Sequence, residues 1–182
     1  MSKIIVIVGS LRRESINRKL ATALTKLAKP GTEFRFANIG DLPLFNQDQE
    51  SNPPESVTLL KHEIEGADGV LIVTPEYNRS IPGVLKNAID WASRPYGKNS
   101  FNDKPAAVIG TSQGAIGTAL AQQHLRSIVT YLNVLLMGQP EGYITYKKDL
   151  VDDNGHVTDE SVRKFLQTYI DAFTAWVERH NR

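Results

Sequence analysis

The sequence predicts a single doubly wound α/β domain, in which helices cover both faces of a parallel sheet. Two observations predict this class. Short apolar runs alternate with amphipathic helical patterns along all 182 residues, as in parallel sheets built with crossover helices. In addition, the runs at residues 4–8 and 70–73 are continuously apolar, which is typical of strands buried on both faces.

Strands are predicted where β-branched and other apolar residues cluster. These runs occupy residues 4–8, 34–39 (less strongly apolar), 70–73, 106–109 and 134–137. Helices are predicted where apolar residues recur at three-to-four spacing. These segments are residues 16–27, 57–64, 84–91, 119–132 and 158–177. Five strands and five helices match the flavodoxin-like strand order 2-1-3-4-5, in one domain spanning residues 1–182.

Local signals support the predicted ends of three helices. Pro30 and Gly31 end the first helix, and Pro82 suits the first turn of the third. Glu160 and Ser161 provide a cap region where the last helix opens, near residue 158. The polar stretches at residues 43–54 and 152–156 are expected to be surface loops.

Composition excludes several classes of function. The formal net charge of +1 gives no general attraction to nucleic acid or anionic membranes. The apolar run near the N-terminus is too short for a membrane span or a signal-peptide core, so we expect a cytoplasmic protein. The absence of cysteine excludes disulfides, thiolate nucleophiles and iron–sulfur clusters. The four histidines are scattered, so no metal site is expected.

In a sheet of this order, ligands bind beyond the carboxyl ends of the strands, where the strand order reverses. The loops expected there are residues 9–15, 74–82 and 110–117. Each of them has an unusual composition. Their coincidence at one edge of the sheet predicts a ligand site.

The first loop, GSLRRESIN, lacks both the three glycines of a dinucleotide fingerprint and the Gly-Lys-Ser/Thr of a P-loop. It instead offers hydroxyl, guanidinium and amide groups beside a helix N-terminus. These groups suit a monophosphate dianion. The alternative is that the serine merely caps the helix and the arginines are solvated. The candidate residues are Ser10, Arg12, Arg13, Ser15 and Asn17.

The second loop begins TPEYNRSIPG and is stiffened by Pro75 and Pro82. Tyr77 supplies an aromatic face, and Glu76, Asn78 and Arg79 add polar atoms in a rigid frame. Such a loop suits a flat heterocycle. The alternative is a proline-stiffened turn whose tyrosine is buried in an interface.

The third loop contains GTSQG, the pattern of a hydrolase nucleophile elbow with Ser112 as nucleophile. Asp152 or Asp153 with His156 or His180 would complete a triad in the required chain order. However, these histidines lie in a polar loop and at the terminus, and a hydrolase would leave the first two loops without a role. The other interpretation is that the glycines let backbone N–H groups approach the polar edge of a ring.

The first two motifs resemble those of the NADPH-dependent FMN reductase family, flavodoxin-like enzymes that include quinone and chromate reductases. GSLRRESIN is similar to the family's G-S-x-R-x-x-S-x-N phosphate loop, and PEYNRSIPGVLKNAIDW to its second signature. The resemblance runs from Lys3 to about Trp176. It implies that the FMN phosphate is bound by Ser10, Arg12, Ser15 and Asn17. It implies that the isoalloxazine ring is bordered by Pro75, Glu76, Tyr77 and Asn78, and on its other side by Ser112, Gln113 and Gly114.

The resemblance also implies the reaction. NADH or NADPH would reduce FMN, which would then reduce a small-molecule acceptor: a quinone, a flavin, an azo compound or an oxidised metal ion such as chromate. No residue stands out as a general acid or base, so the chemistry is expected to reside on FMN. A serine hydrolase remains an alternative. A non-catalytic electron carrier is another, although the near-neutral charge disfavours it.

The resemblance further implies homodimers or homotetramers. Arg126 lies in the fourth predicted helix, and Glu141 follows the last predicted strand. We expect Arg126, Glu141 and Tyr77 to form part of a subunit contact beside the flavin. The alternative is that Arg126 and Glu141 form an ordinary surface pair.

Overall fold

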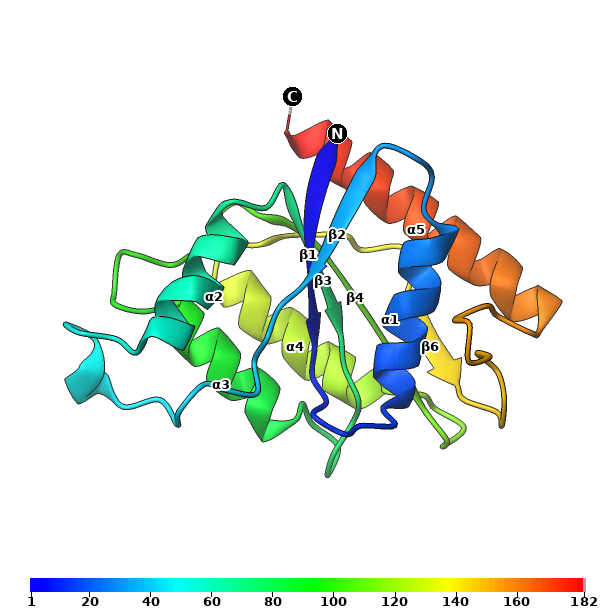
Figure 1. Cartoon of the computed structure of the whole chain (residues 1–182), viewed down its shortest axis with the longest axis horizontal. Coiled ribbons are helices and arrows are strands. Elements are labelled where there is room, and N and C mark those ends of the chain that lie inside the picture. The colour runs from blue at the N-terminus through cyan, green and yellow to red at the C-terminus, as the bar shows by residue number, and fades with distance from the viewer. Residues whose placement is uncertain (182) are drawn as a thin grey trace.

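The computed structural model describes residues 1–181 and confirms the predicted fold class (Figure 1). A parallel sheet has the order β2-β1-β3-β4-β5, and β6 also pairs with β4. The strands are β1 (Ser2–Val8), β2 (Thr32–Phe36), β3 (Gly69–Val73), β4 (Pro105–Ser112), β5 (Leu135–Leu136) and β6 (Gly142–Thr145). The helices are α1 (Ile16–Leu27), the short 3₁₀ helix η1 (Gln47–Gln49), α2 (Glu55–Glu65), α3 (Gly83–Ala92), α4 (Ala119–Tyr131) and α5 (Glu160–His180).

Two hydrophobic cores lie on opposite faces of the sheet. Helices α1 and α5 cover one face, and α2, α3 and α4 cover the other. In β1, Ile4 and Val6 face the first core, whereas Ile5 and Ile7 face the second. Because alternate side chains of a strand point to opposite faces, burial on both faces requires the continuous apolar run seen in the sequence.

The last position of the sheet differs from the prediction. One strand is expected at residues 134–137, but β5 pairs only with Pro105 and Ala106, and β6 pairs further along β4, with residues 109–112. Pro140 has no N–H to donate to the ladder, and it lies in the segment that separates β5 from β6. The ladder resumes at Gly142, where a Cβ would lie 2.4 Å from Cγ1 of Ile109.

Several boundaries also differ from the prediction. Strand β4 covers residues 105–112 rather than 106–109, so the first three residues of the loop predicted at 110–117 belong to the strand. Strand β2 covers residues 32–36 rather than 34–39. Helix α5 begins at Glu160, and its N-cap is Asp159, whose carboxylate accepts hydrogen bonds from the N–H groups of Ser161 and Val162.

A two-way amide contact holds the start of α1 against the end of β4. Nδ2 of Asn17 donates to the carbonyl of Thr111 at 2.9 Å, and the N–H of Thr111 donates to Oδ1 of Asn17 at 3.0 Å. Both residues are buried. The contact satisfies the buried N–H and C=O of Thr111 beyond the last pair of the β3–β4 ladder. It also fixes the loop after β1 relative to the end of β4.

The ends of β3 and β4 meet α4 at Gly110. A Cβ on Gly110 would lie 2.1 Å from the carbonyl oxygen of Thr74 and 2.2 Å from Oγ1 of Thr118. A glycine is therefore required for this close approach. The approach holds the residue after β3 against the start of α4. The loops after β1, β3 and β4 lie at the lower edge of the sheet in Figure 1.

We predict that Gly110→Ala lowers the free energy of unfolding by about 2–3 kcal/mol, because an overpacked methyl group displaces backbone. Urea denaturation would measure the change. The control is Gly138→Ala, since a Cβ there meets no heavy atom within 4 Å, and a change within about 0.5 kcal/mol is expected. Equal effects of the two substitutions would contradict the close approach at Gly110.

We predict that Asn17→Ala lowers the free energy of unfolding by about 2–4 kcal/mol, because it leaves the buried N–H and C=O of Thr111 without partners. The exposed Asn52 provides the control, and Asn52→Ala should be nearly neutral. If Asn17→Ala were equally neutral in urea denaturation, the Asn17–Thr111 contact would not contribute to stability.

Candidate cofactor site

A cavity of roughly 190 Å³ opens where the loops after β1, β3 and β4 meet. It lies at the carboxyl ends of the strands, as the strand order predicts. All but two of the predicted cofactor residues line it, and the exceptions are Asn78 and Gly114. The lining residues are Ser10, Arg12, Ser15, Ile16, Asn17, Pro75, Glu76, Tyr77, Thr111, Ser112 and Gln113.

A larger hollow of about 300 Å³ lies elsewhere, near the start of β1 and beside β2. Arg35 and Glu63, which help to line it, pair with each other at 2.8 Å. Lys3 and Glu33 place this hollow toward the amino ends of the strands. In this fold class, ligands bind at the opposite edge of the sheet.

One end of the cavity is rich in hydrogen-bond donors. Ser15 is the N-cap of α1, and its Oγ accepts a hydrogen bond from the N–H of Arg18, so its hydroxyl hydrogen remains free to donate. The first N–H groups of a helix have no intrahelical partners and favour anions. The structure also separates the two adjacent arginines. Arg12 lines the cavity, whereas the Arg13 side chain is 97% exposed and lies 4.0 Å from Glu14.

Asn17 has a more restricted role than the motif suggests. Its carbonyl oxygen and one amide hydrogen are engaged by Thr111. One amide N–H therefore remains for a ligand. Asn17 thus fixes the start of α1 against β4 and keeps one donor free of Thr111.

The loop after β3 ends in a two-residue hairpin. Tyr77 and Ser80 exchange two backbone hydrogen bonds of 3.0 Å, and between them Asn78 and Arg79 have positive φ angles of 50° and 63°. Pro75 and Tyr77 line the cavity, whereas Asn78 lies at the tip of the turn, outside the lining. The Tyr77 ring is half-exposed. The carboxylate of Glu76 instead accepts hydrogen bonds from the N–H groups of Leu120 and Ala121.

Ser112 is the last residue of β4, and its hydroxyl is engaged by the loop that follows. It donates to the carbonyl of Gly117 and accepts from the N–H of Gly114 at 3.2 Å. Among residues 1–181, no histidine is hydrogen-bonded to it: His156 lies against Asp152, and His180 against the carbonyl of Trp176. The triad of a serine hydrolase is therefore not assembled.

Two lining residues, Ile16 and Thr111, were not among the predicted site residues. Thr111 lies inside the GTSQG motif, so its position was a usable signal. Ile16 is the first residue of α1, and its apolar side chain gave no indication of a polar site.

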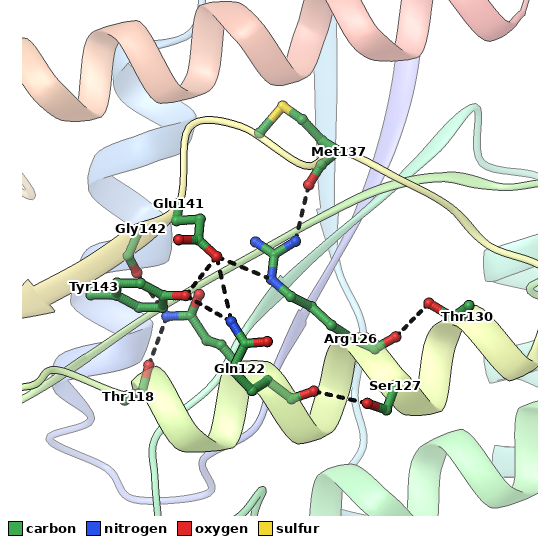
Figure 2. A network of polar contacts seen from close by, with 10 residues as sticks. Thr118, Gln122, Arg126, Ser127, Thr130, Met137, Glu141, Gly142 and Tyr143 are labelled. Atoms are coloured by element: carbon green, nitrogen blue, oxygen red, sulfur yellow. Dashed lines mark hydrogen bonds and ion pairs between the residues drawn. The ribbon is translucent and has the colours of Figure 1, made fainter.

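Arg126 and Glu141 do meet, within a polar network beside α4 (Figure 2). Nε of Arg126 lies 4.0 Å from Oε1 of Glu141, and Nη1 donates to the carbonyl of Met137 at 3.3 Å. The Tyr143 hydroxyl donates to the same Glu141 oxygen at 2.7 Å. Burial raises the pKa of the Tyr143 phenol, and its hydrogen bond to Glu141 adds to the shift. Tyr77, the third residue of the expected contact, is not in the network that Figure 2 draws.

Two absences among residues 1–181 bear on other functions. These residues contain no group of three or more histidine, aspartate or glutamate side chains placed to bind a metal ion. None of their helices has both the length and the apolar character needed to span a membrane.

Comparison with known proteins agrees with this architecture. The NADPH-dependent FMN reductase family matches residues 2–149. A 2-hydroxy-1,4-benzoquinone reductase from Burkholderia sp is 56% identical over 175 residues, covering 96% of each chain. A quinone reductase from Pseudomonas putida is 48% identical, covering 95% of this chain and 93% of the relative. The solved structure of FerB, a flavoenzyme NAD(P)H:(acceptor) oxidoreductase from Paracoccus denitrificans, superposes with a TM-score of 0.95 at 52% identity, covering 99% of both chains. The chain therefore belongs to the NADPH-dependent FMN reductase family.

Proposed function

We propose that this chain transfers reducing equivalents from NADH or NADPH to quinones, using FMN held in the cavity between the three loops. The observation that carries the proposal is the composition of that cavity. Hydrogen-bond donors that suit a phosphate line one end, and residues of a rigid hairpin loop with an aromatic side chain line the other. The names of the Burkholderia and Pseudomonas relatives support a quinone as acceptor. Free flavins, azo compounds and chromate are further acceptors to be tested.

At the phosphate end, three side chains have groups available for the ligand. Ser10 and Ser15 contribute hydroxyl groups, and Arg12 contributes a guanidinium group. The remaining amide N–H of Asn17 provides one more donor. Together with the N-terminus of α1, these groups bind a dianion through charge-assisted hydrogen bonds.

At the ring end, the two loops flank a flat group. Pro75 and Tyr77 lie on one side, with Asn78 at the hairpin tip. Ser112, Gln113 and Gly114 lie on the other, and because the hydroxyl of Ser112 is engaged by Gly117, it supports the loop. When bound, FMN would supply the hydride chemistry, because the flavin can accept hydride from NADH or NADPH and donate it to the quinone. The half-exposed Tyr77 leaves room for a planar substrate to enter beside it.

We predict that Arg12→Ala weakens FMN binding by roughly 10- to 150-fold. This range corresponds to the loss of one charged hydrogen bond, which contributes about 1.5–3 kcal/mol. Riboflavin has no phosphate, so its affinity should change little. Quenching of flavin fluorescence on titration of apo-protein would give both dissociation constants. Arg13→Ala is the matched control, because Arg13 points to solvent. If Arg12→Ala left the FMN affinity unchanged, the phosphate assignment would be wrong.

We also propose that the chain forms homodimers or homotetramers, with Arg126, Glu141 and Tyr77 in a contact beside the flavin. The Arg126 side chain is only 15% exposed and that of Glu141 is 35% exposed. The exposed part of the Glu141 side chain is available to a second copy. Exposed apolar side chains are also present at Tyr77 in the hairpin, at Ile116 before α4 and at Leu120 in its first turn.

We predict that Arg126→Ala shifts the assembly toward smaller species in sedimentation at low micromolar protein. Removing one member of a desolvated ion pair costs about 3–5 kcal/mol, against about 0–1 kcal/mol for an exposed pair. Arg163→Ala removes an exposed pair with Glu160 and serves as the control. An unchanged sedimentation profile, together with an unchanged KM for the acceptor, would assign Arg126 to the surface of a single subunit.

A further inference from the structure

We infer that Glu76 is a positioning residue, which joins the loop carrying Pro75 and Tyr77 to the first turn of α4. The inference rests on the proposed FMN site, because it identifies Glu76 as the residue that holds one wall of that site in position. It gives Glu76 a role distinct from direct contact with the ring.

The contacts of the Glu76 carboxylate are on the side facing α4. Oε2 accepts hydrogen bonds from the N–H of Leu120 at 3.0 Å and from the N–H of Ala121 at 3.1 Å. Oε1 lies 3.6 Å from Nη1 of Arg79. The side chain is only 9% exposed. Two helix N–H groups and an arginine therefore hold this carboxylate on the α4 side of the loop.

Helix α4 depends on Glu76 because it has no local side-chain cap. Its N-cap residue is Thr118, whose side chain makes no capping hydrogen bond and instead accepts from Nε2 of Gln122. By contrast, α1 and α5 are capped by Ser15 and Asp159, the residues directly before them. The cap of α4 comes from 44 residues earlier in the chain. A cap from such a distance fixes two loops relative to each other as well as the helix end.

A second contact ties the same loop to α4. Oγ of Ser80 lies 3.0 Å from Nδ1 of His124, one turn after the residues that Glu76 contacts. Ser80 is also paired with Tyr77 across the hairpin. The hairpin is therefore attached to α4 on both sides of Tyr77. Since α4 directly follows the loop that contains Gln113, the two sides of the proposed ring site are joined through its first turns.

The experiment uses apo-protein and three variants. Glu76→Ala removes the cap, and Glu76→Gln keeps one carbonyl oxygen that can accept from the same N–H groups. Asp159→Ala is the control: it removes a carboxylate that also accepts from two N–H groups of a first helical turn, in α5, and additionally from the hydroxyl of Ser161, outside the cavity lining. The measurements are hydrogen exchange of the Leu120 and Ala121 amides, and the dissociation constants of FMN and riboflavin.

In apo Glu76→Ala, exchange at Leu120 and Ala121 should be accelerated about tenfold or more, because their acceptor is lost. Both FMN and riboflavin should bind about 10- to 100-fold more weakly, since a misplaced site wall can cost that much. Their affinity ratio should be unchanged, because the phosphate loop is intact. In Glu76→Gln, the exchange rates of the two amides and the two dissociation constants should stay within about threefold of the wild-type values. Asp159→Ala should leave both affinities unchanged.

Unchanged exchange and unchanged affinities in Glu76→Ala would overturn the inference. So would an equal loss of affinity in Asp159→Ala, because that result would indicate a general loss of stability. A loss of affinity for FMN but not for riboflavin would group Glu76 with the residues that bind the phosphate, and this result would also overturn the inference. If wild-type protein bound neither FMN nor riboflavin, the proposed function would fail, whereas the exchange rates in apo-protein would still decide whether Glu76 caps α4.

Discussion

The burial of β1, β3 and β4 on both faces is the constraint on which the rest of the structure depends. Polar side chains along these strands would have to be buried without partners, which is costly. Polar chemistry is therefore confined to the places where the strands end. Because the strands are parallel, those ends lie at one edge of the sheet. Loops far apart in the sequence consequently share one cavity.

The same edge leaves backbone groups in need of partners, because the strand ladders stop and the helices begin there. Asn17 satisfies Thr111 at the end of β4, and Glu76 satisfies the first turn of α4. Ser112, the last residue of β4, donates a hydrogen bond to Gly117 in the loop that follows. These contacts stabilise the fold and at the same time set the positions of the loops. Stability and site geometry are thus determined by the same hydrogen bonds.

Charge is distributed unevenly along the cavity. Arg12 and the N-terminus of α1 make one end positive. Near the other end, the negative charge of Glu76 is balanced by α4 and Arg79. This arrangement favours a ligand whose negative charge is concentrated at one end and whose other end is flat and uncharged. FMN has this distribution of charge, whereas riboflavin lacks the charged end.

The sequence by itself determined the fold class, the strand order and most of the cavity lining. Hydrophobic periodicity is a local signal, and the continuous apolar runs were short and rich in β-branched residues, which is typical of buried strands rather than helices. The rule for parallel sheets then indicated which loops converge, so the order of the strands was enough to place residues such as Ser10, Tyr77 and Gln113 together.

The tertiary structure alone decided the division of the last strand and the partners of Asn17 and Glu76. β6 is short, and it forms where Gly142 lets the chain approach Ile109, a contact between residues far apart in the sequence. The partner of Asn17 is 94 residues away and that of Glu76 is 44 residues away. A local pattern shows that a carboxylate or an amide is present but not which group it will meet. That choice depends on which loops the buried sheet brings side by side.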